Sequence, residues 1–364
     1  MAKCSKAYDL ALSHIREIEG YVPGVQPQDG RWVKLNTNEN PYPPSPMVAM
    51  AISAELNNLS LYPNPESMPL RNTIAARFDL NVDQIIVGNG SDDILNLLVR
   101  TFCDKNESAG TITPNYSLYP VLAGIQGGSF ITIPYDREFT LPIEMIVESP
   151  ANIFFLSSPH APTGVAYTSK EIADLLERFS GILVVDEAYA DFAKETMVAL
   201  VNQYQNLVIT RSLSKSYSLA GLRVGFAFAA PEIINLLDRV RDSYNVNRLS
   251  QAGAIAALKD ESYYKETIAK VIKTREFCGQ ELKKRDWFYY PSQANFVFTE
   301  PLNGEKKSGP EVAESLYEYL YVRNILVRLL SSSPLTAGFI RISIGDEKQM
   351  NILFETIDSW QKNA

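Results

Sequence analysis

Short, almost wholly apolar segments recur along the first two thirds of this chain, and they constrain its fold more than any other feature. They lie at residues 85–87, 110–113, 130–133, 153–156, 182–185, 207–210 and 224–229. Stretches with helical periodicity, such as residues 92–99 and 172–176, stand between several of them. Strands that are apolar on both faces are typical of a parallel sheet covered by helices on both sides. The pattern therefore predicts an α/β fold with a mostly parallel central sheet.

The character of the sequence changes near residue 240. Helical stretches at residues 231–242 and 250–284 precede short apolar runs at 296–298, 325–327 and 339–343. This order predicts a smaller α+β domain. We expect a large domain at residues 41–240, a small domain at 241–364, and an N-terminal helix and arm at 1–40 that pack on the small domain. The Pro-rich part of the arm is either a surface linker or an extended segment that lines a site.

Charge and cysteine content exclude several classes of partner. Of 364 residues, 34 are Lys or Arg and 42 are Asp or Glu, which gives a net charge of −8. Nucleic acid and anionic membranes are therefore not expected as partners, and no apolar run is long enough to span a bilayer. Cys4, Cys103 and Cys278 form no CxxC pair, so we expect no metal site and a reducing, cytoplasmic location. Residues 1–19 read as an amphipathic helix, not a signal peptide.

Residues 212–223 hold the chain's most reactive combination of side chains. Lys215 stands beside Ser212 and Ser214, with Arg223 a few residues on, and Asp186 ends an upstream apolar run. Hydroxyls and a guanidinium can bind a phosphate, and a lysine held beside them can react with an aldehyde. Together with a carboxylate for a pyridinium nitrogen, these are the groups that a pyridoxal-phosphate enzyme supplies. A lone Asp at a strand end is more often a simple cap.

Other motifs leave alternatives open. The Gly88–Asp93 turn is either a plain helix start capped by Ser91 or a phosphate site at a helix N-terminus. Arg328 and Arg341 near small-domain strands are either solvated edge residues or a pair that binds an anionic substrate. A Walker B-like strand lacks any P-loop, and the SxxK match at Ser212 lacks its usual partner motifs.

Taken together, these residues resemble the pyridoxal-phosphate-dependent aminotransferases of fold type I, class II, and most closely the histidinol-phosphate aminotransferase family. The resemblance runs nearly the whole length of the chain. The segments that carry it are residues 21–24, 35–41, 61–63, 88–92, 114–116, 162–164, 186–189, 212–225, 244–247 and 340–343.

The resemblance implies a role for each matching residue. Lys215 would form a Schiff base with pyridoxal 5′-phosphate and move the substrate's proton, while Asp186 would keep the pyridine nitrogen protonated. Tyr189 would donate to the phenolic oxygen, and Tyr116 would stack on the ring. The phosphate would be held by Ser91, Asp92, Ser212, Ser214 and Arg223, and by Tyr62 of a neighbouring subunit. This implies a homodimer with shared sites, in which the arm also packs on the partner.

The resemblance also implies the substrates. Arg341 and Arg328, with Tyr21 and Asn247, would bind the anionic groups of histidinol phosphate and of glutamate or 2-oxoglutarate in a ping-pong transamination of histidine biosynthesis. The imidazole would lie under the arm near residues 38–42, which include Asn38. The same scaffold resembles threonine-phosphate decarboxylases and aromatic amino-acid transaminases, and a non-catalytic pyridoxal-phosphate-binding protein is a third hypothesis.

One position departs from the family pattern. Many relatives have Asn immediately before Pro-Thr-Gly, bonded to the phenolic oxygen of the cofactor, whereas this chain has Ala161 preceded by His160. A lost neutral hydrogen bond is worth roughly 0.5–1.5 kcal/mol, so we expect tuning of the cofactor to change while binding persists. His160 or a water molecule is predicted to fill the gap.

Overall fold

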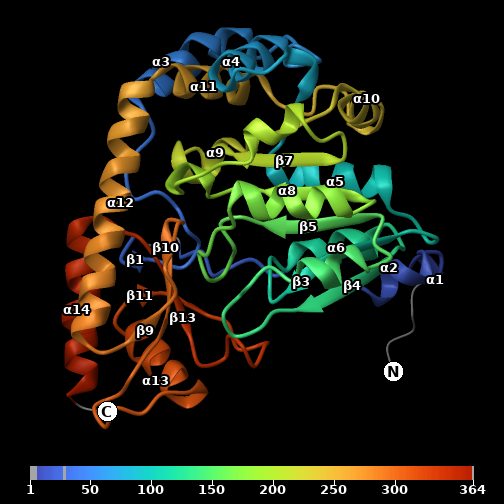
Figure 1. Ribbon diagram of the computed structural model, residues 1–364. Helices are drawn as coiled ribbons and strands as arrows, with labels where there is room; N and C mark the ends of the chain where they lie inside the picture. Colours follow the sequence, from blue (N-terminus) through green and yellow to red (C-terminus); the bar gives the residue numbers. More distant parts are fainter. Residues whose placement is uncertain (1–5, 28–29, 363–364) are drawn as a thin grey trace.

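The computed structural model describes residues 6–27 and 30–362, which form two lobes (Figure 1). The large lobe is built on a seven-stranded sheet with the order β2-β8-β7-β6-β5-β3-β4. Its strands are β2 (Ile85–Gly88), β3 (Ser108–Thr113), β4 (Ser129–Pro134), β5 (Ile153–Ser157), β6 (Ile182–Asp186), β7 (Leu207–Ser212) and β8 (Gly225–Ala229). All run parallel except β8, which is antiparallel to both of its neighbours. The predicted mostly parallel α/β sheet is confirmed.

Helices cover both faces of this sheet, as its apolar strands require. Along β6, Leu183 and Val185 enter one hydrophobic cluster while Val184 enters another. The first cluster is covered by α3 (Pro46–Glu55), α4 (Met68–Phe78), α7 (Ile143–Val147), α8 (Ser169–Arg178) and α11 (Arg248–Lys259). The second is covered by α5 (Ser91–Phe102), α6 (Leu118–Ile125) and α10 (Pro231–Val240). Because side chains alternate across a strand, both layers are needed to bury the sheet.

The small lobe packs its strands against long helices. A four-stranded antiparallel sheet has the order β12-β13-β10-β9, and a separate parallel pair joins β1 and β11. The strands are β1 (Val33–Lys34), β9 (Phe288–Tyr289), β10 (Phe296–Glu300), β11 (Ile325–Leu326), β12 (Arg328–Leu329) and β13 (Ile340–Ser343). The helices are α12 (Glu261–Lys284), α13 (Pro310–Tyr321) and α14 (Glu347–Gln361). Their apolar faces form a third cluster, so the predicted α+β character is found.

The lobes are joined through α12, the long helix that runs from one to the other in Figure 1. The predicted helix over residues 250–284 is interrupted at Asp260, whose side chain caps α12 by accepting from the Tyr263 N–H. α11 packs on α3 and α4 of the large lobe. Tyr264 contacts both cores, whereas Ile268 and Val271 belong to the small-lobe core. The change from one core to the other therefore falls inside α12, near Tyr264, whereas the sequence predicted a domain boundary at residues 240–241.

The N-terminal segment differs from the expectation. It forms two short helices, α1 (Lys6–Asp9) and α2 (Ser13–Glu17), because the extended backbone of Leu12 (φ −59°, ψ 141°) separates them. α2 lies against α6 of the large lobe, where Ile18 faces Gly124. The later part of the arm joins the small lobe, where β1 pairs with β11 and Leu35 O accepts from the Ser343 N–H (3.0 Å). The first five residues of the predicted helix lie outside the described part of the chain.

Five short 3₁₀ helices and the single-turn α9 complete the fold. They are η1 (Leu56–Asn58), η2 (Val82–Gln84), η3 (Ala190–Phe192), η4 (Val198–Asn202), η5 (Ala220–Leu222) and α9 (Leu213–Ser216). Within residues 6–27 and 30–362, no helix is long and apolar enough to cross a membrane. The carboxyl ends of the parallel strands meet at one edge of the large sheet, next to the small lobe, and ligand sites of such sheets lie there.

Candidate active site

Lys215 lies on α9, directly after β7. Its Nζ donates to Thr37 O (2.9 Å), and Asn40 Nδ2 donates to Lys215 O (3.0 Å), so the arm crosses over the lysine. Burial, helped by the guanidinium of Arg341, lowers the pKa of Lys215 to about 8. The amine is therefore partly uncharged near neutral pH, which is the form that attacks a carbonyl.

Asp186 ends β6 and lies inside the protein, 6% exposed. It accepts from Tyr119 Oη (2.9 Å), Thr210 Oγ1 (3.0 Å) and the Ala188 N–H (3.2 Å). Burial raises its pKa to about 6, although the donors act in the opposite direction. The carboxylate thus remains mostly ionised at pH 7 in an apolar setting, as a partner for a buried cation.

Sequence reasoning missed Tyr119 and Thr210. Thr210 lies opposite Asp186 in the parallel register of β6 and β7, so the apolar runs contained the signal that would have found it. Tyr119 comes from α6 and stacks on Phe155 (ring centroids 5.0 Å apart). Its approach to Asp186 depends on helix packing, for which the sequence carries no local signal.

An anion cup forms where β2 leads into α5. Ser91 is the first residue of α5, whose free N–H groups face the start of the helix. Arg223 donates to Ser214 Oγ (3.3 Å) and pairs with Asp92 (3.3 Å). A Cβ on Gly90 would lie 2.5 Å from the end of the Arg223 side chain, which would have to shift, and the φ of +89° is one that side chains with a Cβ rarely adopt. Guanidinium, hydroxyl and helix N–H groups together suit a phosphate dianion.

Ser212, another predicted phosphate ligand, ends β7 immediately before α9. It is the N-cap of α9 and accepts from the Ser214 N–H (3.1 Å). Below α9, the Ser216 hydroxyl bonds to Asp191, which also pairs with Arg211 (2.7 Å). This buried network was not predicted, and it fixes the helix that carries Lys215.

Several tyrosines cluster near Asp92 and Asp186. Tyr116 donates to Asp92 (3.3 Å) and contacts Tyr119 edge-on (ring centroids 5.5 Å apart). Tyr21 of the arm meets Tyr116 edge-on (5.7 Å). Tyr189 follows β6 and accepts from Asn38 Nδ2 (2.9 Å). Asn38, which was predicted to bind substrate, therefore contacts Tyr189.

Two arginines close the site from the small lobe. Arg328 and Arg341 are paired residues of β12 and β13. Arg341 donates to Asn36 O (3.0 Å), while its Nε is buried with no hydrogen-bond partner among the described residues. Burial and the neighbouring Arg328 charge lower its pKa. An unpaired guanidinium nitrogen beside a second cation is a binding place for an anion.

Two predicted site residues lie elsewhere in the single chain. Tyr62 is 77% exposed and stacks on Tyr244 (4.6 Å). Asn247 caps α11 by accepting from the Ser250 N–H (2.9 Å). Neither contacts Lys215 or the arginines within one chain.

His160 does not fill the gap at Ala161. Its Nε2 bonds to Pro114 O and its Nδ1 to Thr163 Oγ1 (both 2.8 Å), and the ring packs against Tyr135 (centroids 4.9 Å apart). Burial lowers its pKa to about 4, so the ring stays neutral. Because both ring nitrogens are occupied, that part of the hypothesis is wrong, and His160 instead joins two loops of the site.

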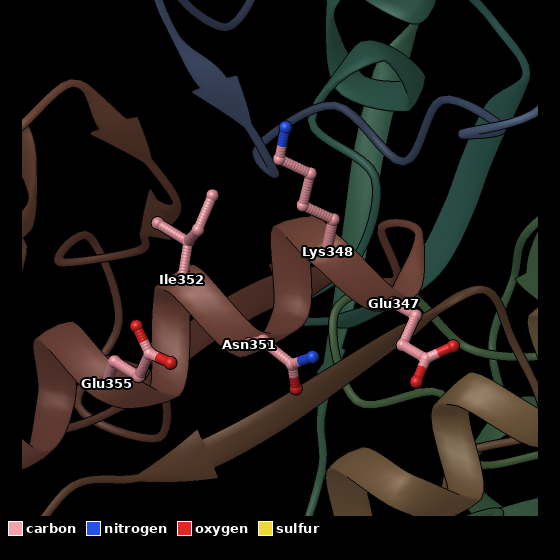
Figure 2. A pocket seen from close by; sticks show the side chains of 5 residues that line it. All are labelled: Glu347, Lys348, Asn351, Ile352 and Glu355. Atoms are coloured by element: carbon pink, nitrogen blue, oxygen red, sulfur yellow. The ribbon is translucent and has the colours of Figure 1, made fainter.

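A hollow on the outer surface of α14 carries no comparable chemistry. Its lining side chains are Glu347, Lys348, Asn351, Ile352 and Glu355, all from one helix (Figure 2). All but Ile352 are exposed, as on an ordinary solvated helix face. The chemistry-bearing groups lie at the sheet edge.

Comparisons with known proteins show the family of the chain. A family model described as "Aminotransferase class I and II" matches residues 30–357, which makes the chain an aminotransferase. The histidinol-phosphate aminotransferase of Geobacter sulfurreducens is 44% identical over 348 residues, 93% of this chain and 95% of the relative. That of Syntrophus aciditrophicus is 40% identical over 97% and 98% of the two chains. The chain belongs to the histidinol-phosphate aminotransferase family.

Solved structures show the same architecture. The crystal structure of histidinol-phosphate aminotransferase from Sinorhizobium meliloti in complex with pyridoxal-5′-phosphate is similar at TM-score 0.81 and 26% identity, covering 90% of this chain and 91% of that one. An L-threonine-O-3-phosphate decarboxylase from Porphyromonas gingivalis shares the fold at TM-score 0.78 and 21% identity. At that identity the second likeness shows the fold alone.

Proposed function

We propose that the chain is a pyridoxal-phosphate-dependent transaminase that interconverts histidinol phosphate and 2-oxoglutarate with imidazole-acetol phosphate and glutamate, as a step of histidine biosynthesis. The observation that carries the proposal is the convergence of Lys215, Asp186 and the anion cup at one edge of the sheet, facing two small-lobe arginines. The relatives at 40–44% identity support the choice of substrate.

The residues present fit pyridoxal phosphate. Arg223, Ser212, Ser214 and the N-terminus of α5 (Ser91, Asp92) are suited to its phosphate, and Lys215 has the lowered pKa that an attacking amine needs. When bound, the cofactor supplies an electron sink for the bond-breaking step. Asp186 would hold a proton at the pyridine nitrogen, Tyr116 would pack on the ring, and Lys215 Nζ would move the substrate proton.

The arginines account for two substrates of different shape. Glutamate presents a carboxylate to Arg341 and Arg328, whereas histidinol phosphate presents a phosphate and no carboxylate. Both anions accept from a planar guanidinium, so one pair can serve each substrate in turn. Tyr21 of the arm, whose ring contacts that of Tyr116, would cover the bound substrate and exclude water.

We also propose a homodimer. Apolar side chains of α3, η1 and the segment after it form an exposed surface, called here the α3–Tyr62 face: Met47, Met50, Leu56, Leu59, Leu61 and Tyr62. A surface of this kind typically marks a protein interface. In a dimer, Tyr62 would reach the phosphate of the partner's site, and the part of Asn247 in substrate binding stays a prediction. The cytoplasmic location stays a prediction.

Single-turnover half-reactions test the function. The purified holoenzyme is mixed separately with glutamate, histidinol phosphate, phenylalanine and threonine phosphate, and the cofactor absorbance is followed. We expect glutamate and histidinol phosphate to convert the cofactor to its amino form and Lys215→Ala to abolish both reactions. Faster reaction with phenylalanine would assign an aromatic transaminase, and release of CO₂ from threonine phosphate a decarboxylase.

A further inference from the structure

Asn38 is placed to set the direction of the Tyr189 hydroxyl hydrogen. The side chain of Asn38 is 1% exposed, and its Nδ2 donates to Tyr189 Oη (2.9 Å). An amide NH₂ can only donate. Tyr189 therefore accepts from Asn38, and its own hydrogen points elsewhere.

The orientation of the amide is fixed by Ser343 at the end of β13. The Asn38 backbone N–H donates to Ser343 Oγ (2.8 Å), and that hydroxyl donates back to Asn38 Oδ1 (2.9 Å). With the amide oxygen held by Ser343, the NH₂ group must face Tyr189. The small lobe fixes the backbone as well, since buried Asn295 Nδ2 donates to Asn38 O (2.9 Å).

The backbone of Asn38 suits this task. Its φ of +55° lies in the left-handed region, which Asn and Asp adopt more readily than other side chains with a Cβ. The amide is thus held between β13 of the small lobe and the loop after β6 of the large lobe. Both polar atoms of the Asn38 side chain already have hydrogen-bond partners. The sequence had instead placed the imidazole of the substrate near this residue.

We propose that Asn38 is a positioning residue that makes Tyr189 a hydrogen-bond donor toward the phenolic oxygen of the cofactor, under control of Ser343. The inference rests on the proposed function, because it requires pyridoxal phosphate at this site. Ala161 gives it weight: position 161 offers no amide and both ring nitrogens of His160 are bonded elsewhere, so Tyr189 is the side chain that the resemblance assigns as donor to that oxygen.

Asn38→Asp tests the direction of the bond with little change of shape. A carboxylate accepts from both Ser343 and Tyr189, so the tyrosine hydrogen would turn toward residue 38 and away from the cofactor. The binding constants of two ligands are measured by titration calorimetry: pyridoxamine phosphate, and an analogue that lacks the phenolic oxygen. Neither needs a covalent bond to Lys215, and any effect of the new charge acts on both.

We expect wild type to prefer pyridoxamine phosphate, and Asn38→Asp to reduce that preference by about tenfold, the size of one hydrogen bond to a charged acceptor. Ser343→Ala should reduce this preference less. Without the Ser343 hydroxyl, the side-chain amide of Asn38 can flip, so its NH₂ group faces Tyr189 only part of the time. In a Tyr189→Phe background, Asn38→Asp should change the preference no further. Asn206→Asp, which removes a donor to Phe179 O away from the site, serves as the matched control and should leave it unchanged.

The inference would be overturned if Asn38→Asp lost the same affinity for both ligands. It would also be overturned if neither Asn38→Asp nor Ser343→Ala, each as a single variant, changed the preference. Asn38 would then have only a structural role. Failure of wild type to bind either ligand would overturn the proposed function together with the inference. Thermal unfolding of each variant verifies that it folds. If Asn38→Asp does not fold, Ser343→Ala, which removes a single hydroxyl, still tests the inference.

Discussion

At the scale of single residues, the reactivity of Lys215 depends on its surroundings. Burial and the Arg341 guanidinium lower its pKa to about 8, below that of an ordinary lysine near 10.4. We expect capture of pyridoxal phosphate by cofactor-free protein, fixed by borohydride and located by mass spectrometry, to rise through about pH 8 and then level off. Arg341→Gln removes a like charge and should move the midpoint upward. If the rate of pyridoxal-phosphate capture by Lys215 kept rising toward pH 10, the low pKa of Lys215 would be contradicted.

Asp186 makes a second, separate pH prediction. Its pKa in the folded cofactor-free chain is raised to about 6 from an ordinary 3.8. The folded state therefore binds this proton more tightly, and the resulting stabilisation is complete below pH 3.8 and lost as the pH rises through 6. Relative to Asp186→Asn, the free energy of unfolding of wild type should fall by about 2 kcal/mol from pH 4 to 7. Urea unfolding across this range measures it.

A matched variant separates Asp186 from other acids. Tyr119→Phe removes a donor that lowers the Asp186 pKa, so the fall should become larger and extend to higher pH. A difference between wild type and Asp186→Asn that does not vary with pH would show that this carboxyl titrates normally.

At the scale of elements, the anion cup depends on how α5 begins. In Gly90→Ala the new Cβ would meet Arg223 at 2.5 Å, in a backbone conformation that side chains with a Cβ rarely adopt. We expect a loss of about 1–3 kcal/mol in the free energy of unfolding and weaker pyridoxal-phosphate binding in calorimetry. Gly221→Ala is the control, because no heavy atom of the described chain lies within 4 Å of its added Cβ. Similar losses in both variants would contradict the proposed cup.

Elements with strong local patterns were the ones that the sequence predicted correctly. Apolar runs bounded by Gly, Pro or Ser became the strands of the central sheet, and the periodic stretch at residues 172–176 lies in α8, which begins at a capping box of Thr168 and Glu171. The break at Asp260 and the split at Leu12 were missed. In both segments the hydrophobic periodicity is compatible with one continuous helix. Tertiary packing or the local backbone conformation nevertheless interrupts the helix there.

At the scale of the whole molecule, the site residues that follow the strands could be placed from topology, because parallel strands end at one edge. The role of Asn38 could not, since it depends on Ser343, 305 positions away in the sequence. Nor could the burial of His160 among aromatic rings be read from its neighbours. Long-range contacts decide what a polar side chain near a site does, and local patterns carry little information about them.

The assembly is the largest-scale prediction. The α3–Tyr62 face exposes Met50 (73%) and Tyr62 (77%), and burial of such apolar surface favours association. Met50→Asp places a charge in that surface, and charges at the core of an interface are strongly unfavourable. We expect wild type to sediment as a dimer and Met50→Asp as a monomer. Because Tyr62 of a partner would then be missing from the phosphate site, the variant should also bind pyridoxal phosphate several-fold more weakly.

Met145→Asp provides the control, since Met145 is also exposed (48%) but lies on α7, away from the α3–Tyr62 face. It should remain dimeric and bind the cofactor normally. Tyr62→Phe separates the two effects, because it should weaken cofactor binding while the dimer persists. A monomeric wild type with full cofactor affinity would show that each chain completes its own site, and Tyr62 would then be only a surface residue stacked on Tyr244.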